Sequence, residues 1–83
     1  MSLITRTGKI DSIFWDDTYP FAIIVADNKE DLFYLCGHEF KQYQGQIEQQ
    51  MHIEFTTIED DEVVLTLKPI KDRASYNSSK HIV

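Results

Sequence analysis

The residues best suited to chemistry are Cys36, His38 and Glu39, which lie close together in the sequence. A thiol, an imidazole and a carboxylate are groups that bind zinc or activate a nucleophile. A tetrahedral zinc site needs four ligands, and the other histidines, His52 and His81, show no ligand spacing that would complete one. Cys36 ends an apolar segment, which favours a buried, unreactive thiol. We therefore expect neither a metal site nor a catalytic residue here.

The remaining candidates for chemistry are carboxylates in polar turns. The acidic run 59–62 lacks the ligand positions and central glycine of a calcium loop. The acidic pairs 16/17 and 30/31 also flank turns, and nothing pairs them for general acid–base catalysis. The sequence contains no phosphate-binding loop, nucleophile elbow or dinucleotide fingerprint. It predicts a protein that is not an enzyme and needs no cofactor.

The elements that would position any binding residue are short apolar segments separated by turns. With 83 residues the chain has room for one small domain, which we expect to span residues 1–70. Strands are predicted at 10–14, 19–26, 32–36, 51–58 and 63–68, and a helical turn between 37 and 47. This pattern predicts an all-β fold, a small five-stranded OB-type barrel, with an SH3-like barrel as the main alternative. Residues 71–83 are polar and without periodicity, which is typical of a flexible tail.

Charge argues against a strong interaction with phosphate. Eight Lys+Arg and fourteen Asp+Glu give this acidic protein a net charge of −6. An acidic body lacks the electrostatic attraction behind most nucleic-acid affinity. The basic residues are concentrated near the end of the chain, where Lys71, Arg73 and Lys80 would form a flexible phosphate clamp.

The sequence also bears on location. No apolar run approaches the roughly 18 residues that a membrane span needs, so we expect no membrane partner. The N-terminus lacks a secretory pattern, and Cys36 is the single cysteine. A free thiol favours the reducing cytoplasm.

Once the strands are placed, the order of motifs resembles a cold-shock domain, the small OB-fold that binds single-stranded nucleic acid. Gly8-Lys9-Ile10 is similar to the opening Gly-Lys-Val of that family. Residues 21–24 (FAII) stand where the family has Phe-Gly-Phe-Ile, and residues 31–35 (DLFYL) where it has Asp-Val-Phe-Val-His. Residues 50–55 (QMHIEF) are similar to its Gln-x-Val-x-Phe stretch. The resemblance covers roughly residues 8–70.

The resemblance implies which side chains face the solvent. It places four residues inside the barrel: Ala22, Ile24, Leu32 and Tyr34. It leaves an apolar patch outside: Phe21, Ile23, Phe33 and Leu35. We expect Phe21, Phe33 and Trp15 to stack on bases, and Lys9 and Lys41 to contact phosphates. Tyr19, Phe40 and Tyr43 would form the rim of this binding surface. Trp15 is equally well explained as a cap on the end of the barrel.

Three interpretations of the apolar patch compete. The first is weak, sequence-tolerant binding of single-stranded RNA or DNA by stacking. The second is a protein partner or self-association, since Asp11, Ile23 and Leu35 replace a basic residue, an aromatic residue and a histidine of the family pattern. In the third, the 37–50 segment or the tail, through Tyr76 and Ile82, covers the patch.

Overall fold

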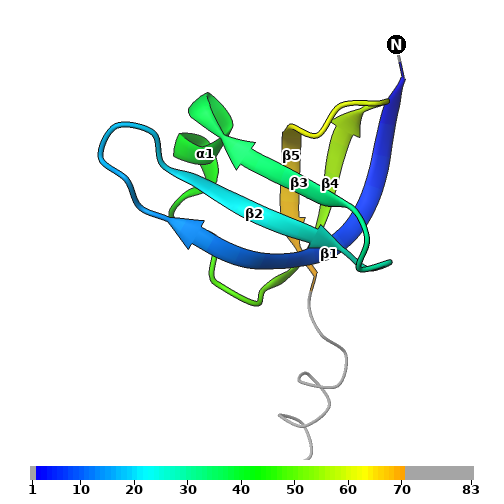
Figure 1. Ribbon diagram of the computed structural model, residues 1–83, viewed down its shortest axis with the longest axis horizontal. Helices are drawn as coiled ribbons and strands as arrows, with labels where there is room; N and C mark the ends of the chain where they lie inside the picture. The colour runs from blue at the N-terminus through cyan, green and yellow to red at the C-terminus, as the bar shows by residue number, and fades with distance from the viewer. Residues whose placement is uncertain (1, 71–83) are drawn as a thin grey trace, which may run out of the picture.

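A computed structural model describes residues 2–70 of the chain, which form a curled antiparallel sheet and one short helix (Figure 1). The elements are β1 (Leu3–Phe14), β2 (Phe21–Ala26), β3 (Leu32–Cys36), α1 (Gly37–Tyr43), β4 (His52–Ile58) and β5 (Val64–Pro69). The all-β, OB-type class predicted from the sequence is confirmed. The predicted flexible tail, with its clamp residues Lys71, Arg73 and Lys80, lies outside the described residues.

The strand order is β3-β2-β1-β4-β5, so β1 is the central strand and is shared by two halves of the sheet. Its first part, Leu3–Lys9, pairs with β4, and its second part, Gly8–Phe14, pairs with β2. The two outer strands approach each other at a parallel bridge between Tyr34 and Val63. The Tyr34 amide there donates to the Glu62 carbonyl oxygen at 2.8 Å. This contact between β3 and β5, with a helix connecting β3 to β4, is the arrangement of a partly open OB-type barrel.

Gly8 and a bulge at Asp11 allow β1 to bend from one half of the sheet into the other. A Cβ atom on Gly8 would lie 2.4 Å from the Val25 carbonyl oxygen, so the close approach of β2 requires glycine. The pairing with β2 shifts between Ile10 and Ser12, which leaves Asp11 as an extra residue and increases the local twist. The predicted strand at 10–14 was therefore too short, because the mainly polar first half of β1 is also part of the sheet.

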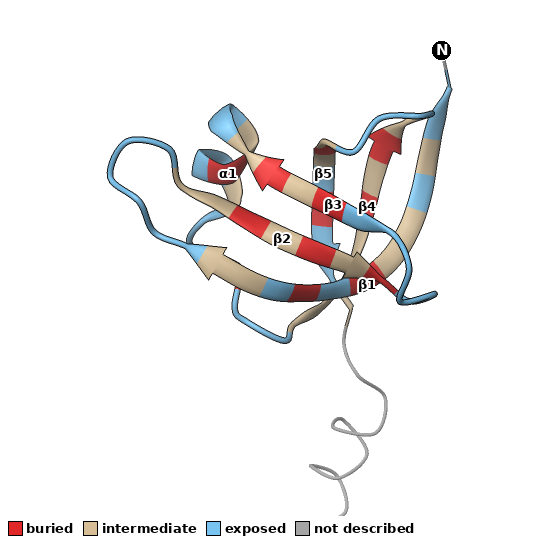
Figure 2. Cartoon of the chain, viewed as in Figure 1, coloured by how far each residue is buried: buried red, intermediate tan, exposed pale blue. Residues whose placement is uncertain are grey.

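The core lies inside the curl, and along β2, β3 and β4 buried residues alternate with less buried ones (Figure 2). Phe33 on β3 and Phe55 on β4 contact each other with ring centroids 5.2 Å apart. The helix contributes Phe40, which is fully buried. The other fully buried hydrophobic side chains are Ile10, Ala22, Ile24, Leu35, Ile53 and Val64.

The predicted orientation of β3 was wrong by one residue. Phe33 and Leu35 point into the core, whereas Leu32 is exposed and Tyr34 is half-buried. Because every residue of this strand is apolar or aromatic, the sequence has no alternation that would fix its inward face, and a shift by one residue reverses both faces. Phe33 and Leu35 gain more from burial than Tyr34, whose hydroxyl needs a partner in the core.

Phe40 was also misplaced by the sequence analysis, which put it at the rim of the binding surface. The sequence predicted only one helical turn in this region, which is too short to define an inward side. The structure has a helix at Gly37–Tyr43. On this helix Phe40 is the buried residue, and Tyr43, which lies nearly one turn later, packs against the core as a partly buried side chain. Neither is a freely exposed rim residue.

Candidate binding face

The outward side chains of β1, β2 and β3 form one continuous surface, which we call the outer face. The strand pairing defines three cross-strand rows of this face. They are Phe14–Phe21–Cys36, Ser12–Ile23–Tyr34 and Lys9–Val25–Leu32. The face is therefore aromatic at one end, mixed in its middle row, and aliphatic with one basic corner at the other end.

The aromatic end is built where β1 ends and β2 begins. The Phe14 and Phe21 rings stack at 4.7 Å, and Phe14 remains 44% exposed. Trp15 meets the buried Phe40 ring edge-on at 5.4 Å yet is 60% exposed, and Tyr19 is 78% exposed. The contact with Phe40 agrees with the predicted cap on the end of the barrel, and the base-stacking role of Trp15 stays a prediction.

The turn between Trp15 and Tyr19 is fixed by Asp16. Its Oδ1 atom accepts hydrogen bonds from the backbone amides of Thr18 at 2.7 Å and Tyr19 at 3.0 Å. These two bonds favour the ionised carboxylate and lower the pKa of Asp16. The exposed ring of Tyr19 thus extends from an ordered turn at the edge of the outer face.

An open groove of about 590 Å³ continues the aromatic end toward the helix. Its walls are mainly apolar, and its volume is typical of sites for small organic groups. Lys41 on α1 lines the groove together with Tyr19, Pro20, Phe21, Tyr34 and Cys36. Cys36 was expected to be buried, but the orientation of β3 turns it outward and leaves it half-buried.

Beyond the aromatic end, the face carries aliphatic side chains and then charge. Ile23 and Val25 are half-buried, and Leu32 is 46% exposed. Lys9 closes the row at the far end and is exposed. Cationic groups thus lie near both ends of β2, Lys41 at one and Lys9 at the other.

A small hydrogen-bonded group of polar residues lies near Lys9, beside the middle of β1 and the end of β2. Asp27 accepts from the Thr7 hydroxyl at 2.5 Å and lies 3.3 Å from His52 Nε2. These contacts, with a weaker contribution from Lys9, lower the pKa of Asp27. They join β1, the β2–β3 turn and β4 at one point.

The structure separates the predicted binding residues into two groups. Lys9, Phe21 and Ile23 lie on the outer face, and Trp15, Tyr19 and Lys41 lie beside its aromatic end. The second group consists of core or core-packed residues: Phe33, Leu35, Phe40 and Tyr43.

The sequence analysis missed Phe14 and Tyr34 as outer-face residues. Phe14 was detectable, because it directly precedes Trp15 at the end of a predicted strand. For Tyr34 the one available signal was its hydroxyl, which is better placed at a surface than in a core.

No family model, no curated protein and no solved structure matches this chain. Among residues 2–70, no group of three or more His, Cys, Asp or Glu side chains is placed to hold a metal ion. The one helix of the described segment is too short to cross a membrane.

Proposed function

We propose that the outer face binds single-stranded RNA or DNA weakly and with little sequence preference, through stacking. The observation that carries this proposal is a group of aromatic rings beside an apolar groove on the outer face of an OB-type barrel. Phe14, Trp15 and Tyr19 are exposed, and Phe21 is half-buried beneath the stacked Phe14 ring. OB-folds bind oligonucleotides on this side of the sheet. The order of motifs supports the same proposal through its resemblance to a diverged cold-shock domain.

Stacking supplies the affinity in this proposal. Each base stacked on an aromatic side chain contributes about 1–3 kcal/mol, whatever the base. Phe21 and Tyr34 lie on neighbouring strands and both line the groove, so Tyr34 takes the part that the sequence analysis gave to Phe33. Phe14 stiffens Phe21 by stacking on it.

Two cations contact the phosphates in this proposal. Lys41 lies beside the groove, and Lys9 lies at the other end of β2, about 13 Å along the strand from Phe21. The acidic residues elsewhere oppose phosphate binding, which keeps the affinity low. The protein acts in this proposal as a cytoplasmic binding module without catalysis or cofactor.

A second candidate function is protein binding, or self-association, through the same face. Its support is the group of aliphatic side chains on the face, since Ile23, Val25 and Leu32 offer no ring for a base. An exposed apolar strip within an acidic surface suits a protein partner with basic residues.

Binding of oligo-U and oligo-dT at low salt, followed by Trp15 fluorescence, tests the first proposal. Phe21→Ala and Tyr34→Ala should each abolish measurable binding while the barrel stays folded. Leu3→Ala is the matched control, because Leu3 is 67% exposed but lies outside the aromatic end. Normal binding by both aromatic variants would exclude the stacking function.

A further variant, Ile23→Lys, separates the two candidates. If the face binds a protein or a second copy, Ile23→Lys should abolish concentration-dependent association and oligonucleotides should have no effect. Saturable oligonucleotide binding by a monodisperse monomer would favour nucleic acid.

A further inference from the structure

The first half of β1 has a strand neighbour on one side only. Leu3–Thr7 pairs with β4, whereas the pairing of β1 with β2 begins at Gly8. The Asp27 amide donates to the Thr7 carbonyl oxygen at 3.0 Å, which shows that Thr7 directs its backbone groups away from β4. Successive residues of a strand alternate in this direction, so Thr5 and Leu3 direct theirs to the same side. Within residues 2–70, no strand pairs with this edge.

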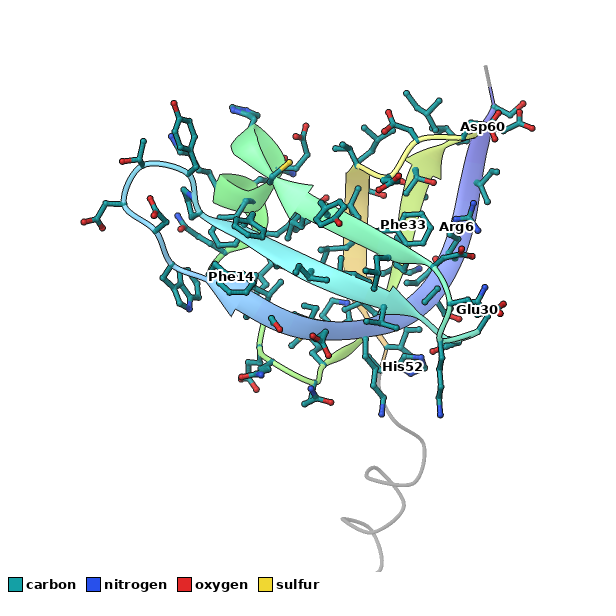
Figure 3. The ribbon with its side chains drawn as sticks, viewed as in Figure 1. Arg6, Phe14, Glu30, Phe33, His52 and Asp60 are labelled. Atoms are coloured by element: carbon teal, nitrogen blue, oxygen red, sulfur yellow. The ribbon has the colours of Figure 1, made fainter. Side chains whose placement is uncertain are left out.

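An open cavity of about 580 Å³ lies beside this edge. It is bounded by β1, β3, the β2–β3 turn and the β4–β5 turn, and Figure 3 shows Arg6 and Phe33 between Glu30 and Asp60. The Arg6 guanidinium lies 4.9 Å from the centre of the Phe33 ring. Arg6 Nε is a buried donor that has no hydrogen-bond partner among the described residues. A buried N–H of this kind is stabilised by a carbonyl oxygen brought to it.

The walls of the cavity are strongly acidic. Six carboxylates line it, against the single guanidinium of Arg6: Glu30, Asp31, Glu59, Asp60, Asp61 and Glu62. The two ion pairs formed within residues 2–70 are His52–Asp27 and Lys68–Glu54, so no wall carboxylate is neutralised by a salt bridge there. A ligand for this cavity must therefore carry positive charge.

We propose that the free edge of β1 binds an extended, basic segment of a partner protein by strand addition. Thr5 and Leu3 would exchange backbone hydrogen bonds with the segment, and one of its carbonyl groups would accept from Arg6 Nε. Alternate side chains of an extended segment point to opposite faces, so lysines or arginines on one face reach the carboxylates. Apolar residues on the other face contact Leu3. This inference does not depend on the proposed nucleic-acid function.

Charge argues for a basic partner and against a second copy of this chain. Edge-to-edge pairing of two β1 strands would bring together two identical sets of acidic walls. Like charges placed opposite each other across a strand pair are destabilising. A basic segment meets opposite charge at the same positions.

Amide chemical shifts of the full chain, titrated with a synthetic peptide of alternating lysine and valine, test this proposal. We expect saturable shifts at Leu3–Thr7 and at 59–62. A peptide of equal length and charge that alternates lysine and proline should not bind, because its prolines cannot donate to a strand edge. Equal binding of both peptides, or shifts on the outer face alone, would overturn the proposal.

Two variants make the test specific to this edge. Thr5→Pro removes an edge-facing N–H and keeps the pairing with β4, so the affinity should fall about five-fold, the effect of one net hydrogen bond. The double variant Asp60→Lys/Glu62→Lys should abolish binding. The control is Glu48→Lys, which should lower the affinity only slightly because Glu48 lies outside the cavity walls. Unchanged binding by Thr5→Pro and by the double lysine variant would contradict strand addition. Failure of the peptide to shift the Leu3–Thr7 amides would also contradict it, and would mean that a second copy or residues 71–83 already close the edge.

Discussion

Phe14 and Phe21 stack across the β1–β2 pair with ring centroids 4.7 Å apart and an interplanar angle of 21°. The pair lies on the outward side of the sheet, directly opposite each other in the strand register. It therefore does not belong to the core, and its solvent-facing surface is available to a ligand. This relationship anchors the aromatic end of the outer face.

The stacked pair predicts a graded response to mutation. Phe14→Ala should weaken oligonucleotide binding several-fold, because Phe21 loses the ring that holds it in place. Phe21→Ala should abolish binding, because the stacking surface itself disappears. Fluorescence titration of both variants checks this order, and a larger loss from Phe14→Ala would contradict it.

The orientation of β3 predicts opposite behaviour for two neighbouring aromatic residues. Phe33→Ala should lower the free energy of unfolding by about 3–5 kcal/mol, because it empties a core position beside Phe55. Tyr34→Ala should cost about 1 kcal/mol of stability and should remove oligonucleotide binding. Urea unfolding and a binding titration measure the two effects, and the reverse pattern would restore the orientation expected from the sequence.

The close approach of β2 to Gly8 predicts that no side chain is tolerated at this position. Gly8→Ala should destabilise the barrel by about 3 kcal/mol, because the new methyl group would clash with backbone atoms of Val25 and Ala26. Gly45→Ala is the control, since its Cβ has no atom within 4 Å and the change restricts the unfolded chain. Thermal unfolding of both variants tests this contrast, and equal stability would refute the close approach of β2.

The contacts of Asp27 predict a loss of stability in acid. Thr7 and His52 lower the pKa of this carboxyl in the folded state. Its contribution is therefore present above the unfolded pKa of about 4 and is lost as the pH falls through the lower, folded value. Asp27→Asn should be less stable than the natural chain at pH 6, and the two should converge below the folded pKa. Urea midpoints measured across pH 2–6 would show this, and a constant difference would contradict it.

The number of cations near the outer face predicts a shallow salt dependence. Two phosphate contacts, at Lys9 and Lys41, give a slope of about −1.4 in a plot of log affinity against log salt concentration. Lys41→Ala should reduce the slope by about 0.7, whereas Lys68→Ala, a change on β5 away from the face, should leave it unchanged. A slope near −3.5 would mean that the cations of residues 71–83 also contact the phosphates.

The sequence predicted the fold class because turns and apolar segments alternate clearly, and β4 shows strict two-residue periodicity. It did not predict the first half of β1, where polar residues face solvent and the inward positions are Ile4, Arg6 and Gly8. That segment carries no hydrophobic alternation, and its place in the sheet depends on pairing with β4, which is distant in sequence.

The candidate site was predicted in part, for a related reason. On β2, the resemblance to the cold-shock pattern placed Phe21 and Ile23 outward, and the structure confirms this orientation, because Ala22 and Ile24 are buried and Phe21 and Ile23 are not. On β3, the uniformly apolar sequence does not distinguish Phe33 from Tyr34, and the packing against Phe55 decides it. The acidic cavity beside β1 was not predicted, because it is formed by two turns and two strands that meet only in the folded chain.

Mapping of amide chemical shifts during a titration with oligo-U at low salt is the decisive test of nucleic-acid binding by the outer face. We expect saturable shifts at Phe14–Phe21, Ile23, Tyr34 and Lys41, with little change at Phe33, Leu35 and Phe40. No shifts at millimolar oligonucleotide, or shifts confined to other surfaces of the barrel, would contradict nucleic-acid binding by the outer face.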